Sequence, residues 1–589
     1  MRLLLFFLGT LCAPAEDLEL PTPLEHYQTY DWEADARALL LELAADVPAE
    51  TQARALALTE SASPDEVRAL LDSIDWKKHR PRLESILLHG SRVLEVVPEE
   101  ASSWLPLIHD SLLLFLDRMS DERFIGRIVA QAHLPKDASR GQRALAFIIE
   151  APSLQKLAQI LARNPSLAPD FGAALQTLEN GLSTARYEEV MESIERELPP
   201  ATEEEYDIEF RDRLLAEASV GAVVEASYRM PGTESGARAA CKVLKPGAVT
   251  ALAEDLKLID RVLAYLEDHA EFYEIGESPL VDIFEEIREA LSHEVQVAAE
   301  RRNLIRAREY YRDAPGIQVP EVLPFSTTNV TCMEFIEGVK ITDAFPGKAE
   351  ERARLARRLS DALTYDVIFS KSETALFHGD PHAGNVFSAP ARGVHPDPYR
   401  IALIDWGLAA EFTEEQREML VQLILGLYLK DPGRLGEHLG VLADLDSADE
   451  DDLERIRESV AGMVARSGSE GMFPLLDELV TELARQGWEI RYQAAIFIKS
   501  QLTIAGILKE LDPEFEQDDH VMGRVRGQVY RELPTRLLRT VWFPAWNSHD
   551  YRSLMSNEDV KDVQWQRTRG FFAKVGKGIW IGVSFQWLF

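Results

Sequence analysis

Cysteine is scarce in this chain of 589 residues, which contains only Cys12, Cys241 and Cys332. The three lie far apart in the sequence and match none of the spacings at which cysteine and histidine side chains bind zinc. The cysteine pattern therefore predicts neither a disulfide framework nor a zinc site. A reducing compartment is the default expectation.

Positive charge is also in short supply, because 63 lysines and arginines stand against 99 aspartates and glutamates, for a formal net charge of −36. A surface that binds nucleic acid must be basic, so this balance argues against a nucleic-acid partner. It also disfavours broad contact with anionic lipid. The composition, with 46% hydrophobic and 28% charged residues, is nevertheless that of a globular protein.

The apolar stretches at both ends are shorter than the roughly 20 residues that a membrane-spanning helix needs. Residues 1–15 contain one arginine, an apolar run and a small-residue ending, which is typical of a signal peptide but short for one. A membrane-touching helix and a misassigned start are the other interpretations. The tail from about Arg539 is rich in tryptophan, phenylalanine and cations, and it predicts either peripheral membrane contact or packing on the protein itself.

Two short strips carry a recognisable chemistry: His-Gly-Asp-Pro-His-Ala-Gly-Asn at 378–385 and Leu-Ile-Asp-Trp-Gly at 403–407. A protein-kinase catalytic loop has the form H-x-D-x-x-x-x-N, and a later D-F-G aspartate binds magnesium. Asp380 and Asn385 have this spacing, and Asp405 opens a D-W-G. We therefore expect Asp380 to be the loop base, with Asn385 and Asp405 as ligands of Mg²⁺ or Mn²⁺.

Other candidate residues surround these strips. His382 stands two residues after Asp380, where kinases often have a lysine, and is a candidate for contact with the γ-phosphate. The segment Ala-Ala-Cys-Lys-Val-Leu-Lys-Pro-Gly at 239–247 has the shape of V-A-I-K. Lys242 would then bind the α- and β-phosphates and Ala240 would line the adenine pocket, with Lys245 as a weaker candidate for the lysine.

An acidic partner for the lysine is expected further along the chain. Apolar residues at helical spacing predict a long helix from about residue 280 to 312, and it carries Glu294 and Glu300. One of these glutamates should pair with Lys242.

These segments resemble the UbiB/AarF family of atypical kinases, linked in bacteria and organelles to ubiquinone or other isoprenoid-lipid metabolism, over roughly residues 150–440. Gln-Lys-Leu-Ala-Gln at 155–159 is similar to the family's K-x-G-Q helix, with Lys156 and Gln159 on one face. Residues 216–222 look like its alanine-rich loop, which replaces the usual glycine-rich phosphate loop. The resemblance implies a substrate gate at the helix and nucleotide contacts from the loop, through Ser219, Val220 and Gly221.

Two more segments support the resemblance. Residues 294–300 are similar to the family's E-x-D followed by the lysine-pairing glutamate, which implies that Glu300 pairs with Lys242 and that Glu294 belongs to the gate. Residues 333–338 look like the hinge between the lobes, which implies that adenine contacts the backbone of Met333, Glu334 and Ile336. The chain departs from the family pattern at Ala158, Ala222, Gln296 and Trp406.

We therefore predict a two-lobed, protein-kinase-like α+β fold with helical extensions at both ends. Thr413 and Gln416 form a capping box that predicts the start of a helix in the second lobe. The expected ligands are ATP or ADP, Mg²⁺ or Mn²⁺ and a lipid or quinone precursor, and the expected location is cytoplasmic, with peripheral membrane contact left open. The expected domains are residues 1–20 (apolar segment), 21–145 (helical extension), 146–205 (helical, with the K-x-G-Q-like motif), 206–340 (N-lobe), 341–535 (C-lobe) and 536–589 (aromatic and basic tail).

Two other functions remain open. A small-molecule phosphotransferase of the aminoglycoside or choline kinase type shares the H-G-D-x-x-x-x-N strip. It does not predict the helix at 155–159 or the Lys-Pro-Gly that follows the lysine strand. A non-catalytic scaffold that binds nucleotide is the second alternative.

Overall fold

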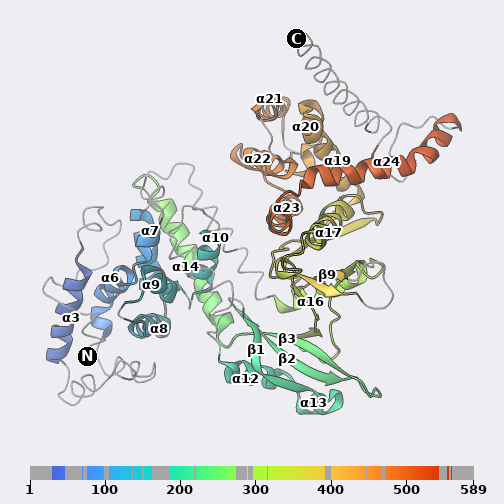
Figure 1. Ribbon diagram of the computed structural model, residues 1–589. Coiled ribbons are helices and arrows are strands. Elements are labelled where there is room, and N and C mark those ends of the chain that lie inside the picture. Colours follow the sequence, from blue (N-terminus) through green and yellow to red (C-terminus); the bar gives the residue numbers. More distant parts are fainter. Residues whose placement is uncertain are drawn as a thin grey trace, which may run out of the picture. The chain divides into compact units, whose positions relative to one another are not determined.

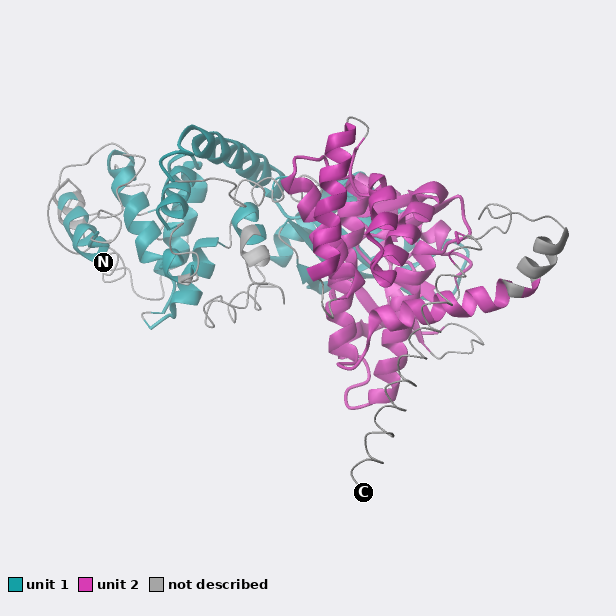
Figure 2. Cartoon of the chain, turned by 90° about the horizontal axis from the view of Figure 1, so that it is seen from above, with its two compact units in different colours: residues 1–297, 323–332 teal, residues 298–322, 333–589 magenta. Residues whose placement is uncertain are grey.

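The computed structural model divides the chain into two compact units (Figure 2). The first unit contains residues 1–297 and 323–332, and the second contains residues 298–322 and 333–589. Helices and largely antiparallel sheets confirm the predicted α+β class. The structure describes residues 30–46, 69, 76–97, 105–135, 137–148, 151–161, 186–217, 220–273, 288, 296–314, 316–391, 399–445, 448–466, 471–542, 554–555 and 559.

The N-terminal part of the first unit is helical, as the apolar periodicity predicted. Its core contains Leu87, Phe124 and Phe147, each at most 1% exposed, and Leu258 of the long helix α14 also belongs to this core. Burying a side chain of this size stabilises a fold by about 1.5–3 kcal/mol. The helices of this part are α3 (Trp32–Asp46), α6 (Arg80–Gly90), α7 (Leu105–Asp117), α8 (Asp121–Ala132), α9 (Arg140–Ile148), α10 (Pro152–Leu161) and α14 (Ala248–Asp268).

A four-stranded sheet, in the order β1-β2-β3-β5, follows in the first unit. One face of the sheet is apolar: Val224 and Ala239 are fully buried there and pack with Val190 and Ile194 of helix α12. Figure 1 shows α12 beside the strands. The elements are α12 (Tyr187–Glu197), α13 (Pro200–Tyr206), β1 (Glu209–Glu217), β2 (Gly221–Arg229), β3 (Gly236–Leu244) and β5 (Val330–Glu334).

A disulfide joins Cys241 of β3 to Cys332 of β5, so the expectation of no disulfide was wrong. The two cysteines are 91 residues apart in the sequence, but their Cα atoms lie 4.0 Å apart because β3 and β5 are neighbours in the sheet. Spacing along the chain carries no sign of this pairing. The bond also removes the basis for expecting a reducing compartment, while Cys12 lies outside the described residues.

The second unit contains two small sheets. One has the order β4-β9-β8-β6, and the other pairs β7 with β10. Phe377 of β7 stacks on Phe412 of β10 at 5.0 Å between ring centroids, and Phe497 meets both rings edge-on. This aromatic core fixes the end of β7. The strands are β4 (Ile317–Gln318), β6 (Val339–Lys340), β7 (Thr374–His378), β8 (Val386–Pro390), β9 (Tyr399–Leu403) and β10 (Ala409–Thr413).

Helices complete the second unit. The predicted capping box is confirmed, because the Thr413 side chain accepts from the Gln416 amide at 3.2 Å and the Gln416 side chain accepts from the Thr413 amide at 3.0 Å. Within the described residues, no helix has the length and apolarity needed to cross a membrane. The helices are α16 (Val297–Tyr310), α17 (Ala349–Ser360), α18 (Asp366–Ile368), α19 (Glu414–Leu429), α20 (Pro432–Glu437), α21 (Glu450–Arg466), α22 (Met472–Arg485), α23 (Tyr492–Leu511) and α24 (Gln517–Trp542).

The disulfide predicts how many thiols react in the unfolded chain. Alkylation in denaturant without reductant should modify Cys12 alone, and prior reduction should expose all three cysteines. Because the bond closes a loop of 91 residues, replacing both Cys241 and Cys332 by alanine should lower the free energy of unfolding by about 4–5 kcal/mol. Cys12→Ser is the matched control and should leave stability unchanged. Three reactive thiols without reductant would contradict the bond.

Candidate functional site

The strip at 378–385 and the strip at 403–407 lie side by side in the second unit. Strand β7 ends at His378, and β8 pairs with β9 in a register that places Val386 opposite Leu403. The chain therefore enters β8 beside the point at which it leaves β9. One residue further out, the Ile404 amide donates to the Asn385 carbonyl at 3.0 Å. This bond joins the two strips directly.

The His378 side chain makes two more connections within this region. Its Nε2 lies 3.0 Å from the Ile404 carbonyl, and its Nδ1 accepts from the Asp380 amide at 3.1 Å. A neutral imidazole that carries its proton on Nε2 satisfies both bonds. Burial lowers the pKa of His378, which favours this neutral form. The ring also lies 4.7 Å from the Trp406 ring, so His378 connects the loop to the second strip at several points.

Asn385 and Asp405 have side chains that suit a hard cation. The Asn385 Nδ2 donates to the Asp380 carbonyl at 3.1 Å, so the amide oxygen is the atom that a cation would use. Asp405 has φ 57°, in the left-handed region that non-glycine residues seldom adopt, and its Oδ1 accepts from the Gly407 amide at 3.3 Å. One carboxylate and one amide oxygen fit Mg²⁺, which keeps waters and phosphate oxygens as its other ligands.

Metal sites of another type are not found in the described part of the chain, where no group of three or more His, Cys, Asp and Glu side chains is arranged to hold an ion. His382, the candidate for γ-phosphate contact, is exposed. Its amide donates to the Asp380 carbonyl at 2.9 Å, and its Nδ1 accepts from the Gly384 amide at 3.0 Å. These bonds keep the backbone of the loop tightly turned between Asp380 and Asn385.

Helix α16 carries Glu300, which is 7% exposed. Three residues later, Asn303 donates from Nδ2 to the Trp406 carbonyl at 3.1 Å, so this helix is attached to the second strip. Asn303 belongs to none of the sequence motifs. Its position one helical turn after Glu300 is the feature of the sequence from which its place at the site could have been predicted. Lys242 and Glu300 belong to different units, and their pairing stays a prediction. Glu294 lies outside the described residues.

The predicted phosphate-binding segment belongs to the first unit. Lys242 lies on β3 opposite Val223, and its Cε is 3.8 Å from the position that a Cβ on Gly221 would occupy. The lysine side chain therefore runs beside the end of the alanine-rich loop, where Val220 is buried. Ala240 is half-buried on the same face of β3. Ser219 lies outside the described residues.

Lys245, the weaker lysine candidate, has a different environment. Its Nζ lies 2.6 Å from Glu217 Oε1, and both side chains are largely buried. The Lys245 amide also donates to the Val220 carbonyl at 2.9 Å. Lys245 therefore contacts both Glu217 and Val220, and this use of its side chain favours Lys242 as the residue for phosphate.

The helix predicted to act as a substrate gate belongs to the first unit. Helix α10 carries Lys156, which is half-buried, and Gln159, whose side chain is outside the described residues. The Asp255 carboxylate of α14 accepts from the Ser153 amide at 2.9 Å and from its hydroxyl at 2.6 Å, so α14 holds the start of α10. An acidic residue at this end of a helix also stabilises the helix dipole.

The predicted hinge, residues 333–338, begins with the last two residues of β5 and continues beyond the strand. Met333 is buried, while Glu334 and Ile336 are half-buried. The Glu334 amide donates to the Glu321 carbonyl at 2.8 Å, and its side chain accepts from Gln318 Nε2 at 3.1 Å. This amide is already used within the fold, so adenine would have to find its partners among the other backbone groups of the hinge.

Residues 177–439 match the family model described as the ABC1 atypical kinase-like domain. The chain is 26% identical over 64% of its length to the Arabidopsis thaliana protein named Activity of BC1 complex kinase 7, chloroplastic, and the match spans 54% of that protein. It is 25% identical to a probable protein kinase UbiB of Cellvibrio japonicus, over 64% of this chain and 67% of the relative. A probable protein kinase UbiB of Shewanella piezotolerans is 27% identical, over 65% and 68% respectively.

The close packing around Gly379 predicts a sensitive position beside Asp380. A Cβ there would lie 2.7 Å from Leu408 Cγ and 2.8 Å from Ile496 Cγ2. Gly379→Ala should therefore lower the free energy of unfolding by about 1–3 kcal/mol. The matched control is Gly506→Ala on α23, where a Cβ meets nothing within 4 Å and alanine should add up to about 1 kcal/mol. Urea unfolding measures both changes, and equal stability of the two variants would contradict this packing.

Proposed function

We propose that the protein binds ATP or ADP with Mg²⁺ or Mn²⁺ and hydrolyses ATP or transfers its terminal phosphate, because residues 177–439 match the model of the ABC1 atypical kinase-like domain. The observation that carries this proposal is the local geometry of the second unit. There Asn385 directly precedes β8, Asp405 lies two residues after the end of β9, and these two strands pair with each other. Asp380 is bonded to His378 and Asn385 within the first strip, which the bond from the Ile404 amide to the Asn385 carbonyl joins to the second.

Each of these residues has a role in the proposal. Asn385 and Asp405 would hold the metal ion, which neutralises phosphate charge when it is bound. Asp380 would accept a proton from the attacking hydroxyl or water. Lys242 would bind the α- and β-phosphates, with Glu300 orienting it. His378 keeps the loop in position through bonds that need its neutral form.

We further propose that the activity serves isoprenoid-lipid or quinone metabolism and that its natural turnover is slow ATP hydrolysis rather than rapid protein phosphorylation. Both points rest on the resemblance to the UbiB/AarF family, in particular on the helix with Lys156 and Gln159. The ABC1 family match favours this function over a small-molecule phosphotransferase. A scaffold without catalysis would bind nucleotide but release no phosphate, so an ATPase assay separates it from the proposed enzyme.

Nucleotide binding should depend on the metal through Asp405. The melting temperature of the wild-type protein should rise with ADP only when Mg²⁺ or Mn²⁺ is present. Asp405→Asn removes a charged ligand and should weaken metal-dependent ADP binding by about ten-fold or more. Asp313→Asn, an exposed aspartate of the same unit, is the matched control and should behave as wild type. Metal-independent binding by the wild type would refute the assignment.

The C-terminal tail should attach the protein loosely to anionic membranes. Each cation near an anionic leaflet contributes about 1 kcal/mol, and the tail holds Arg567, Arg569, Lys574 and Lys577 among its aromatic residues. Flotation with anionic vesicles should therefore be reversible, salt-sensitive and lost when the four cations are changed to glutamine. A chain truncated after Asn547 should also fail to float. Equal flotation of the intact and truncated chains would show that the tail packs on the protein.

A further inference from the structure

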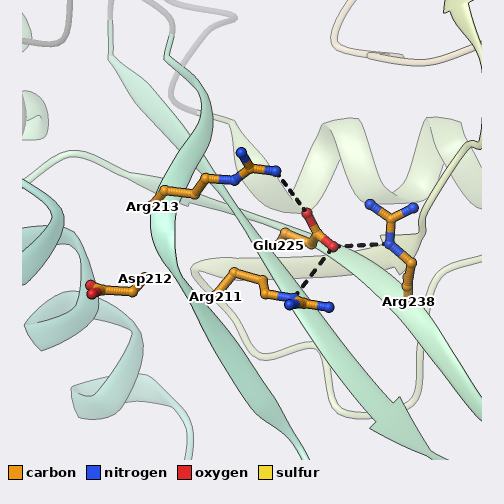
Figure 3. A pocket seen from close by; sticks show the side chains of 5 residues that line it. All are labelled: Arg211, Asp212, Arg213, Glu225 and Arg238. Atoms are coloured by element: carbon orange, nitrogen blue, oxygen red, sulfur yellow. Dashed lines mark hydrogen bonds and ion pairs between the residues drawn. The ribbon is translucent and has the colours of Figure 1, made fainter.

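A pocket of about 510 Å³ opens on the sheet of the first unit, lined by Arg211, Asp212, Arg213, Glu225 and Arg238 (Figure 3). Its residues come from three adjacent strands, β1, β2 and β3. None of them belongs to the sequence motifs. Three arginines in one place stand out in a chain whose formal net charge is −36.

The register of the strands shows which face of the sheet carries the pocket. Glu225 pairs with Ala240, and Lys242 pairs with Val223, two residues earlier on β2. Alternate residues of a strand share a face, so Glu225 and Arg238 lie on the same face as Ala240 and Lys242. Arg238 and Lys242 are four residues apart on β3, or about 13 Å. The pocket is therefore separate from the position predicted for the nucleotide phosphates.

An irregularity in β1 brings two arginines to one carboxylate. Phe210 pairs with Ala226 and Leu214 pairs with Val224, so three residues of β1 stand opposite Glu225 alone. Such bulges redirect side chains and are frequent beside functional sites. Figure 3 shows Arg211 and Arg213 directed at Glu225, while the Asp212 side chain lies apart from them. Asp212 contributes to raising the pKa of Tyr187 on α12, which agrees with a position on the α12 side of the sheet.

The contacts around Glu225 are unequal. Arg238 Nε donates to Glu225 Oε1 at 2.9 Å. Arg211 and Arg213 reach the same carboxylate only at 3.7 and 3.9 Å, and their side chains are 62% and 74% exposed. Neither of these two donates a hydrogen bond to any residue that the structure describes. A guanidinium has five N–H donors, so both have unused capacity at the pocket.

The charge and the donors together indicate the ligand. Glu225 is buried, and the hydrogen bond from Arg238 lowers its pKa, so the carboxylate is charged at neutral pH. The five residues that line the pocket carry three positive and two negative charges, for a net charge of +1, and the Asp212 carboxylate lies apart from the three guanidiniums. A phosphomonoester carries about −1.5 to −2 at pH 7 and has three oxygens that can accept from the arginine forks. A single carboxylate carries a smaller charge and has two such oxygens.

We propose that Arg211 and Arg213 bind a phosphate group at this pocket, with the Arg238–Glu225 pair as its floor. The ligand is a phosphomonoester or diphosphate, either a soluble compound or the headgroup of a phospholipid. This site shares no residue with the positions predicted for the nucleotide phosphates and the metal ion, and its Glu225 lies opposite Ala240, the residue expected to line the adenine pocket.

Titration calorimetry of the full-length chain with pyrophosphate, without divalent metal, tests the site. The wild type should bind, and the Arg211→Gln/Arg213→Gln variant should bind at least ten-fold more weakly. Arg229→Gln, an exposed arginine of β2 that pairs with Asp207 at 3.0 Å, is the matched control and should bind as wild type. Lys242→Met, which lacks the lysine predicted to bind the nucleotide phosphates, should keep the pyrophosphate binding that the double-arginine variant loses, because the proposed site does not use this lysine.

Vesicles identify the source of the phosphate. Flotation with phosphatidylcholine vesicles containing phosphatidic acid should be weaker for the double-arginine variant if the ligand is a headgroup, and unchanged if it is a soluble compound. Equal pyrophosphate binding by the wild type and the double variant would overturn the proposal. No binding by the wild type would overturn it too, as would a loss of binding in Lys242→Met alone.

Discussion

The hydrogen bond from the Ile404 amide to the Asn385 carbonyl is the contact on which the candidate site depends. It joins a loop and a strand end that are nineteen residues apart in sequence, and His378 reinforces it from the other side through the Ile404 carbonyl. Each such bond stabilises the fold by only about 0.5–1.5 kcal/mol. Their larger effect is geometric, because they hold Asp380, Asn385 and Asp405 in one place before any ligand arrives, so that less ordering is needed on binding.

The first unit places opposite properties on the two faces of one sheet. The face against α12 is apolar and contains the Cys241–Cys332 bond, whereas the other face carries Lys242, Glu225 and Arg238. This division arises because successive side chains of a strand point to opposite faces of the sheet, and Cys241 and Lys242 are adjacent residues of β3. The disulfide therefore holds β3 against β5 directly behind the lysine. Because the disulfide fixes β3 against β5, it also fixes the position of the charged side chains that β3 carries on the other face.

The sequence was most informative where the structure is local. The two strips, the capping box of Thr413 and Gln416, and the helical character of the N-terminal extension each depend on residues close together in the chain, so motif and periodicity sufficed to predict them. The disulfide and the arginine pocket depend instead on which strands are neighbours and on a bulge in β1, and linear spacing contains neither. The contact between Asn303 and Trp406 joins residues 103 positions apart, so no local motif predicts it. The roles assigned to Asp380, Asn385 and Asp405 stay predictions.

A crystal structure of the full-length protein with ADP and Mn²⁺, with the metal located by its anomalous scattering, tests the central claim most directly. The account predicts one ion bonded to the Asn385 amide oxygen and to an Asp405 carboxylate oxygen, at about 2.1 Å, with nucleotide phosphate oxygens among its other ligands. Manganese bound to ADP without contact to either side chain would contradict the claim that these two residues form the metal site.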